Sequence, residues 1–374
     1  MKLETAIAHV GLGADPATGA ISVPIHQSAT FRHPALGEST GFDYSRTSNP
    51  TRKALEDAIA SLEGGDRGFA FASGMAAIAA VMSIFESGDH LVFSEDLYGG
   101  TYRLVDKVFS RFGLQASFVD SSDLAALAAA FRPGQTKAVF VETPSNPLMR
   151  VTDIRETASL AAAHGALTIV DNTLMTPLLQ RPLALGADLV VHSGTKFLGG
   201  HNDVLCGLVV TKNEELSRQV GFVQNSTGGV LGPQDSWLLI RGLKTLGVRM
   251  ERAQRNAALI AGWLERRAEV AKVYHPGSEA HFRQASGAGA VLSFTVRDAA
   301  LAASIINHVK VISFAESLGG VETLITYPAR QTHGDIPAAT RERNGITDTL
   351  LRLSVGIEDA QDLIDDLAQA LEAT

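Results

Sequence analysis

Between residues 68 and 191 the chain alternates short apolar segments with segments of helical pattern. Short apolar segments separated by helices are typical of buried strands in a mostly parallel sheet with helices on both faces. The 35 glycines suit the tight turns that such a fold requires. We therefore expect an α/β fold, with strands at 68–72, 90–93, 116–119, 138–141, 166–170 and 187–191.

Polar clusters directly follow four of these segments. In an open parallel sheet, ligands bind outside the carboxyl ends of the strands. The four clusters therefore predict a single site, composed of residues 73–75, 142–146, 171–173 and 193–196.

Lys196 is the most informative residue in these clusters. It follows an apolar strand, stands near the hydroxyls of Ser193 and Thr195, and precedes a pair of glycines. A lysine in such a position can hold a carbonyl cofactor as a Schiff base. Asp171 ends another strand and can oppose a ring nitrogen. The pair predicts pyridoxal 5′-phosphate (PLP), although each residue taken singly also fits a surface lysine or a helix-capping aspartate.

Three further segments carry groups that suit such a cofactor. Gly74 and Met75 begin a helix after a strand, where backbone N–H groups favour a phosphate, while Ser73 also fits a plain N-cap. Tyr98 precedes two glycines and fits either a core ring or a ring stacked on a flat cofactor. Tyr44 and Arg46 resemble a phosphate clamp in an extended segment, although an exposed arginine is usually solvated.

Arg352 lies in the apolar segment 350–355, and a buried arginine needs an anion such as a substrate carboxylate. His192, His201 and Asp203 match no zinc-binding pattern, so we expect no metal. The single cysteine, Cys206, excludes an internal disulfide and suits a buried strand in a cytoplasmic protein.

The chain divides into three parts by pattern. Residues 1–46 have many turn formers and little periodicity, and we expect an arm that reaches a partner subunit. Residues 47–240 form the expected large PLP-binding domain, which begins with a helix at 51–63. Residues 241–374 form the expected smaller α+β domain, with strands near 290–294 and 351–355 and a final helix at 359–371.

Composition excludes several classes of partner. The net charge of −8 argues against nucleic acid. No apolar run approaches the ~20 residues of a membrane span, and the first residues lack the pattern of a signal peptide. Small-molecule substrates remain the expected partners.

Taken together, the motifs resemble the Cys/Met-metabolism family of PLP enzymes, the cystathionine γ-synthase and γ-lyase group, over essentially the whole chain. The residues that carry the resemblance are 43–46, 49–52, 73–75, 98–103, 142–147, 170–173, 193–196, 316–320 and 352–356.

The resemblance implies a PLP-dependent fold type I (aspartate-aminotransferase type) and a homotetramer made of two tight dimers. It implies that Lys196 and Tyr98 are catalytic, Lys196 as the cofactor's amine and a proton carrier. The other implied cofactor-binding residues are Gly74, Met75, Asn146, Asp171, Ser193 and Thr195, with Tyr44 and Arg46 from the partner. The implied substrate-binding residues are Arg352, Ser317, Glu316, Asp43 and Arg103.

Which reaction the resemblance implies depends on a few positions. Asp43 and the segment 326–337 are similar to γ-synthases that use acetylated homoserine, and Thr47 replaces an arginine found in synthases that use succinylated homoserine, although Arg103 remains. The segment 224–235 is instead similar to bacterial γ-lyases. Glu316 favours cystathionine as product or substrate over methanethiol chemistry, and 200–203 departs from the sulfhydrylase pattern.

We therefore expect γ-replacement of an O-acyl-homoserine, acetyl favoured over succinyl, by L-cysteine to give L-cystathionine. The alternatives are cystathionine γ-lyase, an O-acetylhomoserine sulfhydrylase or methionine γ-lyase activity, and a non-catalytic binding protein. The joint presence of Lys196, Asp171, Tyr98 and Arg352 disfavours the last of these.

Overall fold

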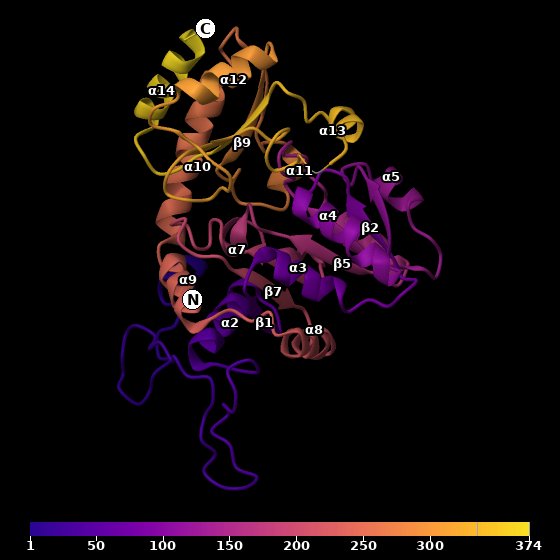
Figure 1. Ribbon diagram of the computed structural model, residues 1–374, viewed down its shortest axis with the longest axis vertical. Helices are drawn as coiled ribbons and strands as arrows, with labels where there is room; N and C mark the ends of the chain where they lie inside the picture. Colours follow the sequence, from indigo (N-terminus) through magenta and orange to yellow (C-terminus); the bar gives the residue numbers. More distant parts are fainter. Residues whose placement is uncertain (335, 374) are drawn as a thin grey trace.

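The computed structural model describes residues 1–334 and 336–373. Its two sheets lie one above the other along the long axis of the molecule, and the helix α10 (Leu246–Leu264) extends from the upper sheet toward the lower one (Figure 1). The lower sheet has seven strands and the upper sheet five. This arrangement confirms the expected α/β class with a second, smaller sheet domain.

The large sheet has the strand order β1-β7-β6-β5-β4-β2-β3. Five successive strands of this sheet, β3, β2, β4, β5 and β6, run parallel to one another. The strand β7 is antiparallel to both of its neighbours, β6 and β1. The expected apolar segments form its strands because side chains on both faces are covered, as in the fully buried β2. The strands are β1 (Arg67–Phe71), β2 (His90–Ser94), β3 (Gln115–Val119), β4 (Thr136–Glu142), β5 (Leu167–Asp171), β6 (Leu189–Ser193) and β7 (Gly207–Thr211).

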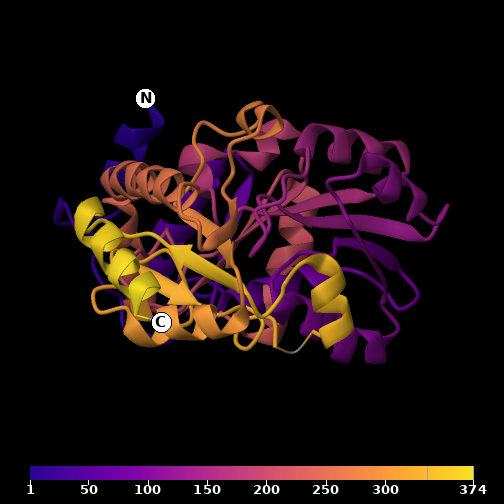
Figure 2. The same ribbon diagram turned by 90° about the horizontal axis from the view of Figure 1, so that it is seen from above.

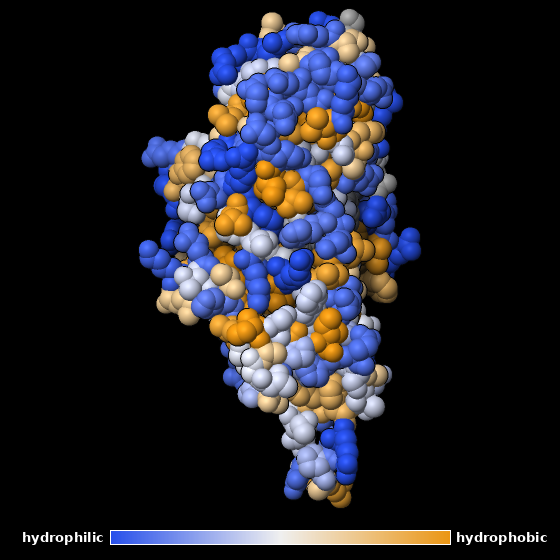
Figure 3. All heavy atoms as spheres, turned by 90° about the vertical axis from the view of Figure 1, so that its left-hand side faces the viewer, coloured by the Kyte–Doolittle hydropathy of each residue, from blue (hydrophilic) through white to orange (hydrophobic). Residues whose placement is uncertain are grey.

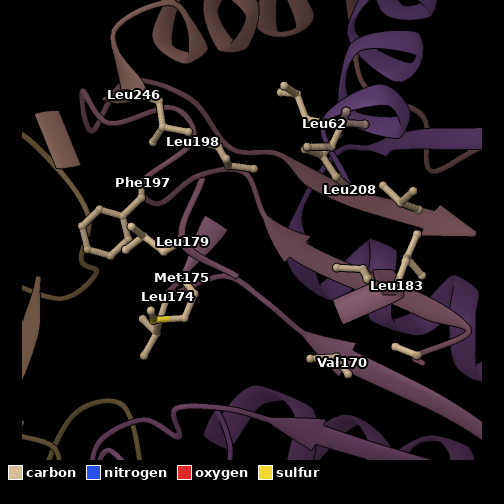
Figure 4. Packing of buried hydrophobic residues seen from close by; sticks show 14 of the residues in the cluster. Leu62, Val170, Leu174, Met175, Leu179, Leu183, Phe197, Leu198, Leu208 and Leu246 are labelled. Atoms are coloured by element: carbon tan, nitrogen blue, oxygen red, sulfur yellow. The ribbon is translucent and has the colours of Figure 1, made fainter. Parts of the chain in front are cut away.

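Helices cover both faces of this sheet. On one face α3 (Gly74–Met82) and α8 (Glu214–Thr227) pack against the aromatic and branched side chains of the strands. On the other face α2 (Pro50–Glu63) closes a larger core, in which Leu62 lies near Leu208 of β7 and Val170 belongs to the same cluster (Figure 4). The remaining helices of this part are α4 (Gly99–Lys107), η1 (Phe109–Phe112), α5 (Leu124–Ala129), α6 (Ile154–Ala163), α7 (Thr176–Leu179), η2 (Pro182–Leu185) and α9 (Pro233–Leu243).

The small sheet has the order β10-β11-β12-β9-β8 and is antiparallel except for the β10–β11 pair. Its core is separate from that of the large sheet and is closed by α10, α12 and α14, which lie side by side along its outer face (Figure 2). Its elements are β8 (Val270–Tyr274), α11 (Glu279–Phe282), β9 (Val291–Val296), α12 (Ala299–His308), β10 (Ser313–Phe314), β11 (Leu324–Thr326), α13 (Ala338–Asn344), β12 (Leu350–Ser354) and α14 (Ala360–Glu372).

The N-terminal segment has two halves with different environments. In the first half, α1 (Leu3–Ala8) and its flank contribute Ile7, Val10 and Val23 to the large core. In the second half, most residues of 24–48 are exposed. They form a narrow extension from the body of the protein (Figures 1 and 3). The N-terminal segment thus contains a short docked helix, which contacts α2 and α10. Ile7 of this helix is buried, and Leu3 and Ala6 pack against the same core.

Among the described residues, no helix is both long enough and apolar enough to cross a membrane.

Candidate active site

The carboxyl ends of β4, β5 and β6 meet at a cavity of about 330 Å³, called here the strand-end cavity. Residues from both sheets line it, so it lies where the two parts of the chain meet. Of the residues proposed from the sequence, those that line it are Gly74, Met75, Tyr98, Asn146, Asp171, Ser193, Thr195, Lys196, Glu316, Ser317 and Arg352.

Lys196 projects from the turn after β6 into this cavity. Its Nζ donates a 2.6 Å hydrogen bond to the Oγ of Ser317. Burial, aided by the positive charge of Arg352, lowers the pKa of Lys196 to about 8, while Glu316 opposes the shift. A lysine with such a pKa is in part a neutral amine near neutral pH, which is the form that attacks a carbonyl.

The turn that holds Lys196 is fixed by close backbone packing. Thr195 exchanges hydrogen bonds with Cys206, whose N–H donates to Thr195 Oγ1 at 3.0 Å. Gly319 lies so close that a Cβ there would be 2.5 Å from the backbone nitrogen of Phe197. Gly319 also has φ +83°, a region that favours glycine. The segment with Ser317 therefore lies directly against the lysine's own backbone.

Asp171 ends β5 with its carboxylate held in place. Its Oδ1 accepts hydrogen bonds from the N–H and the Oγ1 of Thr173, at 3.0 and 2.5 Å. Thr173 Oγ1 in turn accepts from the N–H of Ser193 at 2.8 Å, which ties β5 to β6. Burial raises the pKa of Asp171, and the two bonds from Thr173 act against that rise.

The start of α3 faces the same cavity. Ser73 caps this helix, because its Oγ accepts from the N–H of Ala76 at 3.1 Å. The N–H groups of Gly74 and Met75 belong to the first turn, where a helix has no internal acceptor for them. A Cβ at Gly74 would be 3.1 Å from the Cβ of Ser193, so glycine allows the two segments to meet. The cap role of Ser73 and an anion site at the next two residues are therefore compatible.

Tyr98 precedes α4 at the rim of the cavity and is 39% exposed. Its backbone N–H donates to Oε2 of Glu142 at 2.9 Å. A Cβ at Gly100 would be 2.5 Å from Cε1 of Tyr98, so only glycine leaves room for the ring in this position. An exposed ring face at a cavity rim suits stacking on a flat group.

Arg352 lies in the middle of β12 and is 1% exposed. Its guanidinium donates to Asn146 Oδ1 at 2.9 Å, to the carbonyl of Ser317 at 2.6 Å and to Thr326 Oγ1 at 3.0 Å. Its buried Nε has no partner in the described part of the protein. Burial lowers the pKa of Arg352 to about 10. A buried cation held only by neutral acceptors is suited to receive a carboxylate.

Four proposed residues lie outside the strand-end cavity of the single chain. Tyr44 and Arg46 are exposed, and Arg46 donates to the carbonyl of Asn225 at 2.6 Å. Asp43 accepts from Ser39 Oγ at 2.6 Å. Arg103 lies on α4 with an exposed side chain.

The cavity also contains Glu142, which belongs to the predicted cluster 142–146 but to which the sequence analysis assigned no role of its own. Glu142 at the end of β4 lines the strand-end cavity beside Asp171. A second cavity of about 530 Å³, called here the side cavity, shares Thr195, Glu316 and Ser317 with the first. Asn202 and Asp203 also line the side cavity. In the described residues, no group of three or more His, Cys, Asp or Glu side chains is arranged to hold a metal ion.

The donor set of the strand-end cavity fits PLP. It offers an amine of lowered pKa, a buried acid and a helix start with adjacent hydroxyls. The family model described as Cys/Met metabolism PLP-dependent enzyme matches residues 4–372. The chain belongs to this family. Its cofactor is therefore PLP, and it is a member of the trans-sulfuration enzymes.

Close relatives in this family have different activities. The chain is 53% identical to the cystathionine γ-synthase/O-acetylhomoserine (thiol)-lyase of Bacillus subtilis, over 99% of this chain and 96% of the relative. It is 52% identical to a cystathionine β-lyase of Lactococcus lactis, over 99% of each chain. The crystal structure of a cystathionine γ-lyase from Lactobacillus plantarum, complexed with L-serine, superposes with a TM-score of 0.97 at 48% identity, over 100% of this chain and 99% of that one.

Proposed function

We propose that the enzyme catalyses γ-replacement, in which an O-acyl-homoserine reacts with L-cysteine to give L-cystathionine and the free carboxylic acid. Acetylated homoserine is the favoured substrate. The observation that carries the proposal is the pair of neighbouring cavities, because Glu316 and Ser317 line both. The strand-end cavity contains the amine and the guanidinium that would engage one amino acid beside the cofactor, and the side cavity is the space proposed for the second. Cystathionine, with an amino-acid group at each end, has this two-part shape.

Eight residues of the strand-end cavity would hold the cofactor. Lys196 would bind its aldehyde, and Asp171 would favour the protonated ring nitrogen. The start of α3, with Ser193 and Thr195, would accept its phosphate. Tyr98 and Asn146 would contact its ring and its oxygen substituent. When bound, PLP withdraws electrons from the substrate carbon next to the amino group.

Arg352 and Lys196 act on the substrate in this proposal, the first by binding it and the second by transferring protons. Arg352 binds the α-carboxylate of the substrate through its guanidinium, which orients the amino acid. Lys196, with a pKa lowered to about 8, takes and returns protons at the substrate's α- and β-carbons. Ser317 joins the two, because its Oγ accepts from Lys196 and its carbonyl accepts from Arg352.

A second copy of the chain completes the site in this proposal. Tyr44 and Arg46 would reach the phosphate of a neighbouring subunit, within a homotetramer of two dimers. The extension 24–48 supports this, because it leaves the body of its own chain (Figure 1) and exposes apolar side chains such as Ile25 and Leu36. Apolar side chains on a projecting segment favour burial against a partner.

Cystathionine γ-elimination is the second candidate. It is favoured by the segment 224–235, which is similar to bacterial γ-lyases, and by the likeness to the Lactobacillus plantarum γ-lyase. Both reactions use the same residues up to loss of the γ-substituent. They differ in whether a thiol or water reacts next.

A substrate panel tests the proposal. O-acetylhomoserine, O-succinylhomoserine and cystathionine are supplied separately, with and without cysteine, and cystathionine, 2-oxobutanoate and pyruvate are measured. Rapid formation of cystathionine from O-acetylhomoserine and cysteine supports γ-replacement. Faster release of 2-oxobutanoate from cystathionine supports the second candidate, and pyruvate as the main product contradicts both.

A further inference from the structure

Three carboxyl groups are buried together at the carboxyl end of the large sheet. Glu142, Asp171 and Asp96 are 6%, 8% and 3% exposed. Glu142 and Asp171 are register partners on the adjacent parallel strands β4 and β5, and both line the strand-end cavity. None of the three has an ion pair within the described chain. Two buried carboxylates this close repel each other and are poorly solvated, so one of them keeps a proton.

The hydrogen bonds that Glu142 and Asp171 accept indicate which of these two carboxyl groups is ionised. Asp171 accepts two bonds, both from Thr173. Glu142 accepts one, from the backbone N–H of Tyr98. Donated bonds stabilise a carboxylate, so the negative charge is favoured on Asp171 and the proton on Glu142. In agreement, burial raises the pKa of Glu142 well above its ordinary value, and the charge of Asp171 raises it further.

The charged groups around Glu142 do not shift the proton from Glu142 to Asp171. Asp96, from the loop after β2, is a further acid, and burial raises its pKa to about 6. Arg352 on β12 is the cation that most favours an ionised Glu142, but it donates its hydrogen bonds to Asn146, Ser317 and Thr326. The other titratable groups at this end of the sheet include Tyr98, Lys196, Glu316, the buried His333 and the ion pair of Glu95 with Arg150. His192 on β6 acts on Asp171 and favours its ionised form.

We propose that Glu142 is a positioning residue that stays protonated in the folded enzyme, so that Asp171 carries the negative charge of this register pair. The side-chain oxygen Oε2 of Glu142 accepts the hydrogen bond from the backbone N–H of Tyr98 and so fixes the position of that residue. The protonated state of Glu142 also removes the carboxylate charge that acts most strongly on Arg352, so that the guanidinium is available to a substrate carboxylate. This role rests on the proposed function of Asp171 and Arg352, but the proton on Glu142 is a property of the protein without cofactor.

The first test uses the apoprotein and is therefore independent of activity. Glutamine has the shape of a protonated glutamate and does not ionise, so Glu142→Gln is the informative variant. Glu95→Gln is the matched control, because Glu95 lies at the same end of the sheet but pairs with Arg150. The melting temperature of each protein is measured between about pH 5 and pH 9, where carboxyl groups of raised pKa affect stability.

The expected result follows from the sign of the shift. A raised pKa gives stability that is complete below the pKa of the unfolded chain and is lost as the pH rises toward the folded value. The wild type should therefore lose stability relative to Glu142→Gln as the pH rises, by several degrees, and Glu95→Gln should not show this trend. Parallel curves for wild type and Glu142→Gln would overturn the proposal, because a purely structural role gives a constant offset.

A second measurement remains decisive if Glu142→Gln does not fold. Infrared spectra of wild-type apoprotein with ¹³C-labelled glutamate at neutral pH show whether any glutamate is un-ionised. Glu56 is also buried with a raised pKa, so Glu56→Gln serves as the control. An un-ionised glutamate band that survives in Glu56→Gln but is lost when Glu142→Asp is added to that variant supports the proposal. Absence of the band from Glu56→Gln, or its survival in the double variant, contradicts it.

Discussion

Lys196 donates a 2.6 Å hydrogen bond from its Nζ to the Oγ of Ser317. The carbonyl of the same serine accepts from Arg352 at 2.6 Å. Ser317 has φ +86°, so its backbone is held in a conformation that few residues adopt. One strained residue thus fixes the amine of the large sheet relative to the guanidinium of the small sheet.

Replacing Arg352 by Ala is expected to raise KM for every amino-acid substrate, with a smaller effect on kcat. A hydrogen bond to a charged group contributes about 1.5–3 kcal/mol, which corresponds to roughly 10- to 100-fold in KM. Steady-state kinetics with each substrate measures the change. Arg330→Ala is the control, because Arg330 is exposed and lies outside the cavity. An unchanged KM in Arg352→Ala would exclude this role.

The lowered pKa of Lys196 predicts a pH-dependent stability of the apoprotein. The pKa falls from 10.5 to about 8 because burial penalises the ammonium form. Such a group contributes its full stability only above pH 10.5, and the contribution is lost as the pH falls to 8.

Lys196→Met removes this effect and should be more stable than wild type at pH 7, by at most about 3 kcal/mol. The difference should shrink as the pH rises above 8. Denaturant unfolding of both apoproteins at several pH values measures it. A difference that is independent of pH would show that Lys196 is not desolvated as described.

Tyr44→Phe and Arg46→Ala should weaken cofactor binding if the extension 24–48 completes the site of a second subunit. Each variant is mixed with Lys196→Ala, refolded together, and assayed for activity. If the clamp crosses subunits, one site of a mixed dimer has both Lys196 and an intact clamp, so part of the activity returns. No recovery in mixed dimers would place both residues in the site of their own chain.

Replacing Asp366 on α14 by Ala is expected to lower the stability of the protein, although this residue lies far from the cavity. Its carboxylate accepts hydrogen bonds from the backbone N–H groups of Lys310, Val311 and Ile312. Asp366→Ala leaves the buried N–H of Ile312 without this partner, at a cost of about 1–3 kcal/mol. It also removes the part-buried bonds from Lys310 and Val311. The control is Asp365→Ala, whose side chain is exposed. Equal melting temperatures for the two variants would contradict this assignment.

Much of the fold was predictable from local pattern. The strands of the large sheet coincide with the expected apolar segments, because a strand buried on both faces must be apolar throughout. Their order in the sheet was not predictable, since the antiparallel β7 inserts between β1 and β6 through contacts distant in sequence. The docking of α1 was missed for a similar reason, because Ile7 and Val10 are too few to form a recognisable helical pattern.

In the site, too, some features follow from local sequence pattern and others depend on contacts between segments distant in sequence. The positions of Lys196, Asp171 and Arg352 at the strand-end cavity were predictable, because each is an ionisable residue that directly follows or interrupts an apolar strand. Glu142 stands in the same position at the end of β4, but its role depends on a neighbour strand and on the backbone of Tyr98. Asn202 and Asp203 line the side cavity only because the segment 313–317 folds against their loop, which no local pattern indicates.

The central claim is that Lys196 is the residue that binds PLP, and one labelling experiment tests it most directly. The purified, PLP-loaded enzyme is reduced with borohydride and digested, and the modified peptide is identified by mass spectrometry. The structure predicts one phosphopyridoxyl group per chain, on the peptide that contains Lys196. A label on any other lysine, or a protein that takes up no label, would contradict the account.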